Sequence, residues 1–142
     1  YHENILLVLN VCLSQDDIDA AKAVMKNVYW AVCPLSNIFI HNALPPIALM
    51  ERNDLKVVVG TDSLSSNDDL DMVKELYCLH SNFPDVSMNK ILGWACLNGA
   101  ELLKKEAVLG SIEKGKRPGI VLLRNVDADG NLTDQSYSER IV

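Results

Sequence analysis

The sequence has few of the residues that build a metal site from neighbouring positions, with three histidines and four cysteines among 142 residues. The cysteines are Cys12, Cys33, Cys78 and Cys96; no two have a C-x-x-C spacing, and none lies beside a pair of histidines. This spacing argues against a zinc finger. We expect the four thiols to be buried small apolar side chains in a reducing compartment, which predicts a cytoplasmic location.

A basic stripe and a long apolar run are also missing. The formal net charge is −6 and the lysines and arginines are scattered, so no nucleic-acid partner is expected. No apolar run approaches membrane-spanning length, and the first residues do not resemble a signal peptide, so no membrane partner is expected. The sequence starts at Tyr1 rather than Met, and 49% of its residues are apolar. We therefore expect a piece of a larger protein, whose absent parts cover apolar surface.

The most informative stretch is 56–63, a valine run that ends in glycine and then a carboxylate. The run has no polar alternation, which predicts a strand buried on both faces in a parallel sheet. Gly60 is expected to leave the strand in a conformation that a Cβ would oppose. Asp62 then lies at the carboxyl end of the strand, where α/β folds bind ligands. It is either a turn or helix-capping residue, or a metal ligand and general base.

The first half of the chain predicts alternating strands and helices. Apolar runs at 5–9 and 28–33 predict two strands, and 14–26 has helical spacing with Ser14 as N-cap. This β-α-β order predicts parallel strands joined by a right-handed crossover. A short helix is expected over 47–53, after two prolines.

The second half predicts helices followed by short strands. Asp68 and Asp69 are expected to open a helix that ends near His80, and Ser87 to cap a second helix that runs to Leu103. Gly99 on that second helix predicts close approach of another backbone. Later segments predict a strand at 120–123, a turn at 127–130 and one more strand within 132–142.

Four motifs in order resemble one enzyme family. They are Cys33-Pro34-Leu35-Ser36-Asn37, Gly60-Thr61-Asp62-Ser63 with Ser66-Asn67, the helix around Trp94–Ala100, and Leu109–Leu123 with its LGSIEKGK start. Together they resemble the last third of a metal-dependent amidohydrolase of the cytosine deaminase/chlorohydrolase type, over about residues 5–123.

The resemblance implies an α/β fold made of the last three βα units of a (β/α)8 TIM-type barrel. These units would be the sixth to eighth and occupy residues 1–108. Residues 109–142 would be the C-terminal strands of a small β-sandwich domain.

It also implies a hydrolase that acts on carbon–nitrogen bonds of cyclic substrates through water activated by a divalent metal, Zn or Fe. Asp62 matches the aspartate that binds metal and accepts the proton of that water. Ser36, Asn37, Ser66 and Asn67 match positions near the substrate, and His41 is expected at the rim. The family reads Val-His-Asn at the end of the sixth strand, whereas this chain has Leu9, which cannot bind metal.

Three hypotheses follow. The first is the C-terminal part of such an enzyme, which alone would bind no metal, be inactive, and associate with itself or with the missing N-terminal part. The second is a catalytically lapsed binding protein of the same fold, because Leu9 replaces the expected histidine. The third is a flavodoxin-like module that binds a small ligand; the absence of glycine from residues 10–14 counts against it.

Overall fold

The computed structural model describes residues 3–142, and these residues form two compact units. The first unit ends at Leu70 and the second begins at Asp71. The expected domain boundary between residues 108 and 109 stays a prediction.

The first unit is an alternating α/β arrangement, as the sequence predicts. Its elements are β1 (Ile5–Val8), α1 (Gln15–Val24), β2 (Val28–Val32), α2 (Pro34–His41), α3 (Ile47–Arg52) and β3 (Lys56–Val59).

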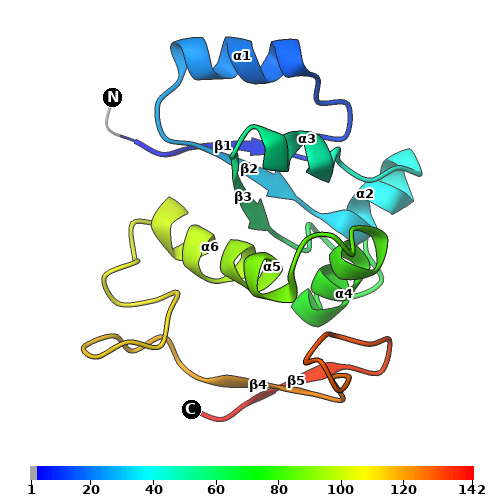
Figure 1. The fold of residues 1–142 in the computed structure, drawn as a ribbon, viewed down its shortest axis with the longest axis vertical. Helices are drawn as coiled ribbons and strands as arrows, with labels where there is room; N and C mark the ends of the chain where they lie inside the picture. Colours follow the sequence, from blue (N-terminus) through cyan, green and yellow to red (C-terminus); the bar gives the residue numbers. More distant parts are fainter. Residues whose placement is uncertain (1–2) are drawn as a thin grey trace. The chain divides into compact units, whose positions relative to one another are not determined.

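The three strands form a parallel sheet in the order β1-β2-β3, which confirms the predicted parallel pairing. Figure 1 shows α1 and α3 on the same face of this sheet, as right-handed crossovers between successive parallel strands require. Val57 and Val58 are buried in β3 as expected, and β2 is buried from Tyr29 onward. Both β1 and β3 are edge strands, so each has one side unpaired within the sheet.

Helix α1 begins at the predicted cap. The Ser14 side chain accepts a hydrogen bond from the Asp17 amide at 3.2 Å, and the Asp17 carboxylate accepts one from the Ser14 amide at 2.9 Å. This reciprocal capping box satisfies backbone groups that a helix start leaves open. The bonds from Ser14, first from its hydroxyl and then from its amide, lower the pKa of Asp17. Lys22 ties the helix to the end of α3 by donating to the Asn53 carbonyl at 2.9 Å.

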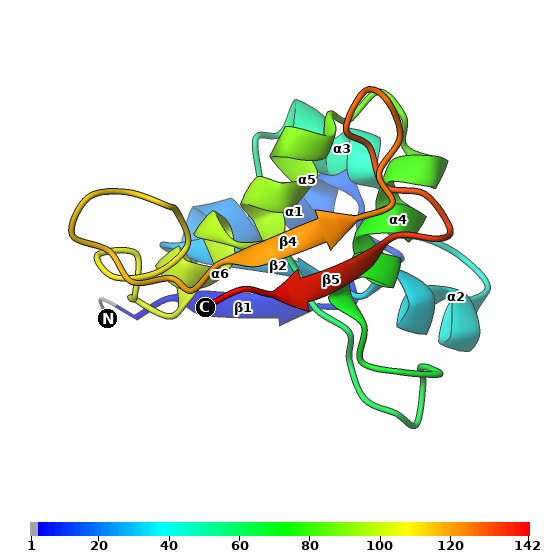
Figure 2. The ribbon, with the colours of Figure 1, turned by 90° about the horizontal axis from the view of Figure 1, so that it is seen from below.

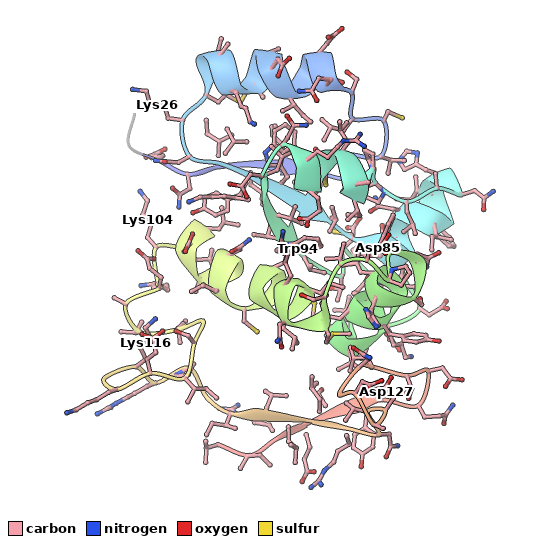
Figure 3. All side chains as sticks on the ribbon, viewed as in Figure 1. Lys26, Asp85, Trp94, Lys104, Lys116 and Asp127 are labelled. Atoms are coloured by element: carbon pink, nitrogen blue, oxygen red, sulfur yellow. The ribbon has the colours of Figure 1, made fainter. Side chains whose placement is uncertain are left out.

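The second unit consists of helices followed by a hairpin. Its elements are α4 (Met72–Asn82), α5 (Met88–Ala95), α6 (Leu97–Leu102), β4 (Val121–Arg124) and β5 (Tyr137–Arg140). Strands β4 and β5 pair antiparallel, as the arrows in Figure 2 show, and Arg124 donates to Glu139 at 2.9 Å across the pair. The turn beyond β4 is held by Asp127, labelled in Figure 3, whose Oδ1 accepts from the amides of Asp129 and Asn131.

Several predictions about the helices were wrong. Helix α4 begins at Met72 and is capped by Asp71, whose carboxylate accepts from the Val73 amide at 2.9 Å; Asp68 and Asp69 lie before it. The helix predicted to reach Leu103 is divided at Cys96 into α5 and α6. A Cβ added to Gly99 would meet nothing within 4 Å, so no backbone approaches it closely. The predicted Ser87 cap is confirmed by its bond from the Lys90 amide at 3.3 Å.

The cysteines are only partly as expected. All four are free thiols; Cys33 and Cys78 are buried, but Cys12 and Cys96 are exposed. Burial, followed by the nearby charge of Glu75, raises the pKa of the Cys78 thiol to about 11. Over residues 3–142, no helix combines the length and the apolar character needed to cross a bilayer.

Candidate active site

The candidate site lies where the three parallel strands of the first unit end. Parallel strands bring their carboxyl ends to one edge of a sheet. Leu9 and Asn10 follow β1, Cys33 follows β2, and Asp62 follows β3. The topology therefore places these residues along one edge.

Asp62 has an unusual backbone. Its φ is +57°, in the left-handed region, where aspartate is among the residues tolerated best after glycine. Gly60, by contrast, does not have a positive φ, and a Cβ there would lie 3.5 Å from Cys33 Sγ, an ordinary contact. The expectation that Gly60 needs a glycine-specific conformation was wrong. The sharp change of direction comes two residues later, and it leaves the Asp62 side chain exposed.

Two serines support the Asp62 carboxylate. Ser36 Oγ lies 2.9 Å from Asp62 Oδ2 and 2.8 Å from Ser66 Oγ. Both serines are buried, at 0% and 6% exposure. Ser36 comes from the first turn of α2, because the helix begins at Pro34 directly after β2. Ser36 and Asn37 thus lie at a helix start, since proline with its fixed φ is well suited to a first helical turn.

The two asparagines lie differently. Asn37 is fully buried; its Oδ1 accepts from the Cys33 amide at 3.2 Å, and its Nδ2 has no hydrogen-bond partner in residues 3–142. Asn67 is half-buried, and its Nδ2 donates to the Thr61 carbonyl at 2.9 Å, which closes the loop around Asp62. His41 is exposed in the last turn of α2, which fits a rim position.

The sequence did not reveal the role of Asn10. Its Nδ2 donates to the Leu7 carbonyl at 3.0 Å and to the Ala31 carbonyl at 2.8 Å, so it ties the end of β1 to β2. Leu9 and Asn10 both have positive φ, +72° and +55°. An asparagine directly after a predicted strand was the available signal, because asparagine favours this conformation.

The donor set present does not make a zinc site by itself. A catalytic zinc takes about three protein ligands. In the part of the chain that the structure describes, no three His, Cys, Asp or Glu side chains converge. Asp62 offers one carboxylate, and Leu9, at the end of β1, offers no donor. Its φ of +72° is nevertheless a conformation in which histidine is enriched and leucine is rare.

Comparison with known proteins identifies the family. Residues 2–138 match the amidohydrolase family. The chain belongs to the amidohydrolase family. Its mixed α/β fold matches that of amidohydrolase deaminases of known structure.

Individual relatives of this amidohydrolase chain are deaminases. A 5′-deoxyadenosine deaminase of Methanobrevibacter smithii is 31% identical, with 94% of this chain and 32% of the relative covered. A 5-methylthioadenosine/S-adenosylhomocysteine deaminase of Moorella thermoacetica is 31% identical over 79% of this chain and 28% of the relative. The chain thus spans about a third of the length of the curated relatives it matches.

Solved structures agree. An adenosine deaminase of Xanthomonas campestris with bound zinc superposes with a TM-score of 0.70 at 28% identity, over 82% of this chain and 28% of that one. The aminofutalosine deaminase of Helicobacter pylori, in complex with methylthio-coformycin, gives a TM-score of 0.69 at 32% identity, over 80% and 28% of the two chains.

Proposed function

We propose that this chain is the C-terminal part of a metal-dependent aminohydrolase that releases ammonia from the base of an adenosine-like nucleoside. The observation that carries the proposal is Asp62, an exposed carboxylate at the carboxyl end of a buried parallel strand, supported from behind by Ser36. The names of the deaminases to which it is similar support a purine nucleoside as the substrate.

The architecture supports incorporation into a larger barrel. Under the proposal, β1, β2 and β3 are the sixth to eighth strands of a (β/α)8 barrel, and residues 109–142 belong to a small β-sandwich. The sheet has two open edges, and Leu6 and Val8 on the edge strand β1 are 41% and 56% exposed. The missing N-terminal part of the polypeptide would pair with these edges; in its absence, a second copy of the chain takes that place.

The chemistry centres on proton transfer at Asp62. A water attacks the ring carbon that bears the amino group, and an Asp62 carboxylate oxygen accepts the proton that the water loses. The carbon–nitrogen bond then breaks, and the amino group takes up that proton and leaves as ammonia. The same carboxylate is one ligand of a divalent metal, Zn or Fe, whose other ligands lie outside this chain. When bound, the metal supplies charge that makes a bound water acidic near neutral pH. Substrate contacts at Asn37 and Asn67 and a cytoplasmic location stay predictions. The substrate contacts predicted at Ser36 and Ser66 are untested, and the burial of both side chains counts against them.

A second candidate is a lapsed enzyme of the same fold that only binds its ligand. Leu9 favours it, because it occupies the position of the family's histidine and offers no donor atom. The left-handed backbone at Leu9 suits leucine poorly and histidine better, which agrees with the loss of a histidine at this position.

A joined protein tests both candidates. Residues 5–142 would replace the matching segment of the Methanobrevibacter smithii 5′-deoxyadenosine deaminase, and ammonia release from 5′-deoxyadenosine would be measured. We expect a Leu9→His version to be active, and Asp62→Asn in that version to lower the rate by about 100- to 10,000-fold. If the joined protein releases ammonia with Leu9 retained, the result favours an active aminohydrolase. If it does so only with Leu9→His, the result favours the catalytically lapsed binding protein.

The matched control is Asp54→Asn. Asp54 also has a left-handed backbone, with φ +50°, and is exposed, but it precedes β3 at the opposite edge of the sheet. This variant should keep the rate of its parent. A folded Leu9→His protein whose rate is unchanged by Asp62→Asn would contradict the proposal.

A further inference from the structure

The support behind Asp62 is a chain of hydroxyl contacts that joins Ser66, Ser36 and the carboxylate. A serine hydroxyl has one hydrogen to donate, and a carboxylate oxygen can only accept. Ser36 Oγ lies within hydrogen-bonding distance of Asp62 Oδ2, at 2.9 Å, and of Ser66 Oγ, at 2.8 Å. Ser36 therefore donates to Asp62, and its hydroxyl also contacts Ser66 as a donor, while the Ser66 hydroxyl donates to the Ser63 carbonyl.

Ser66 is fixed by the loop that also carries Asp62. Its hydroxyl donates to the Ser63 carbonyl at 3.4 Å, and its amide donates to the same carbonyl at 3.1 Å. A bond to a charged acceptor is the stronger kind, so Asp62 is the main acceptor of the Ser36 hydrogen. The contact with Ser66 helps to hold the Ser36 side chain where it reaches Asp62.

Both hydroxyls are out of reach of a ligand. Ser36 is 0% exposed and Ser66 is 6% exposed, whereas Asp62 is exposed. Ser36 is anchored by the first turn of α2, where Asn37 Oδ1 also accepts from the Cys33 amide. The hydroxyl that donates to Asp62 therefore belongs to helix α2, while Asp62 itself lies in a loop.

We infer that Ser36 and Ser66 are positioning residues that hold the Asp62 carboxylate in one orientation, and that they do not touch the substrate. The inference rests on the proposed function for its consequence, because orientation matters only if Asp62 reacts. One carboxylate oxygen, Oδ2, is held by Ser36, which leaves Oδ1 directed away from the hydroxyl chain. The loss of a hydrogen bond behind a reacting carboxylate typically lowers activity by about 10- to 100-fold.

The orientation can be measured on this chain without activity. Three-bond couplings from nuclear magnetic resonance report whether the Asp62 side chain occupies one χ1 rotamer or several. We expect one rotamer in the unaltered chain, averaging in Ser36→Ala, and partial averaging in Ser66→Ala. Ser65→Ala is the matched control, because the Ser63–Ser65 hydroxyl pair, at 2.6 Å, lies in the same loop but is exposed. It should leave the couplings unchanged.

Unchanged Asp62 couplings in folded Ser36→Ala would overturn the inference. If that variant does not fold, unchanged couplings in Ser66→Ala would overturn it, and partial averaging there would support it. In the joined enzyme, positioning predicts a lower kcat in Ser36→Ala at nearly constant KM, whereas a substrate contact predicts a raised KM. The rotamer result tests the hydroxyl chain alone, so it stands or fails separately from the effect of Asp62→Asn on ammonia release.

Discussion

The left-handed backbone at Asp62 gives a stability prediction that compares two residue types at one position. Asp62→Gly and Asp62→Ala both remove the carboxylate and its bond from Ser36. They differ in backbone preference, because alanine at φ +57° has a Cβ clash that glycine lacks. The clash costs about 1–2 kcal/mol, and the greater freedom of glycine in the unfolded chain offsets about 0.5–1 kcal/mol of that. We expect the glycine variant to be more stable than the alanine variant by about 1 kcal/mol.

The same pair of substitutions at Asp54 separates the backbone from the hydrogen bond. Asp54 has φ +50° and is exposed. The glycine variant should be more stable than the alanine variant there by a similar amount. Asp62→Gly should in addition be less stable than Asp54→Gly, by about 1 kcal/mol, because it alone loses a bond between a hydroxyl and a carboxylate.

Urea unfolding, followed by tryptophan fluorescence, measures these differences; Trp30 lies in the first unit and Trp94 in the second, so the change that is sensitive to Asp62 and Asp54 is assigned to Trp30. With a slope of about 1–3 kcal/mol per molar urea, 1 kcal/mol moves the midpoint by about 0.3–1 M. Equal midpoints for Asp62→Gly and Asp62→Ala, or a more stable alanine variant, would refute the left-handed backbone at Asp62 and the geometry built on it.

Three further outcomes follow from the structure. Gly60→Ala should change the free energy of unfolding by less than about 0.5 kcal/mol, whereas Gly110→Ala should cost about 1–3 kcal/mol. Gly110 has φ +89°, and a Cβ there would lie 2.7 Å from another side chain, whereas a Cβ at Gly60 would make only an ordinary contact. The denaturant midpoints of the two variants measure both changes in stability. The lowered pKa of Asp17 adds stability that is present above the ordinary aspartate pKa and is lost as pH falls through the lowered value. In Asp17→Asn, the free energy of unfolding should therefore depend less on pH below about pH 4. The chain alone should increase in mass with concentration by light scattering, and Val8→Lys on edge strand β1 should reduce this; a monomer at every concentration would contradict the open-edge interpretation.

The sequence predicted the parts of the fold that local pattern determines. An unbroken valine run identified β3 as a buried parallel strand, and Ser14 as N-cap identified the start of α1. Where several caps compete within a few residues, pattern failed. Asp68 and Asp69 were predicted to open the helix, but Asp71 caps it, and only the fold decides which carboxylate faces the free amides of α4.

The candidate site was predicted in its residues but not in its arrangement. Asp62 and Ser36 lie 26 positions apart, and their bond depends on how β2 and β3 pair. Because α2 begins directly at Pro34, Ser36 is carried on a helix rather than a loop, and Pro34 was the local signal for this. Gly60 was predicted to have a glycine-specific conformation, but the left-handed backbone lies at Asp62 and Leu9.

Zinc content tests the central claim, that this chain contributes one carboxylate ligand to a metal site completed elsewhere. Plasma mass spectrometry after zinc incubation and desalting would be applied to the chain alone and to its Leu9→His form joined to the Methanobrevibacter smithii segment, each with and without Asp62→Asn. We expect no retained zinc in the chain alone and about one zinc in the joined protein, lost with Asp62→Asn. Zinc retained by the chain alone, or by the joined protein regardless of Asp62→Asn, would contradict the account.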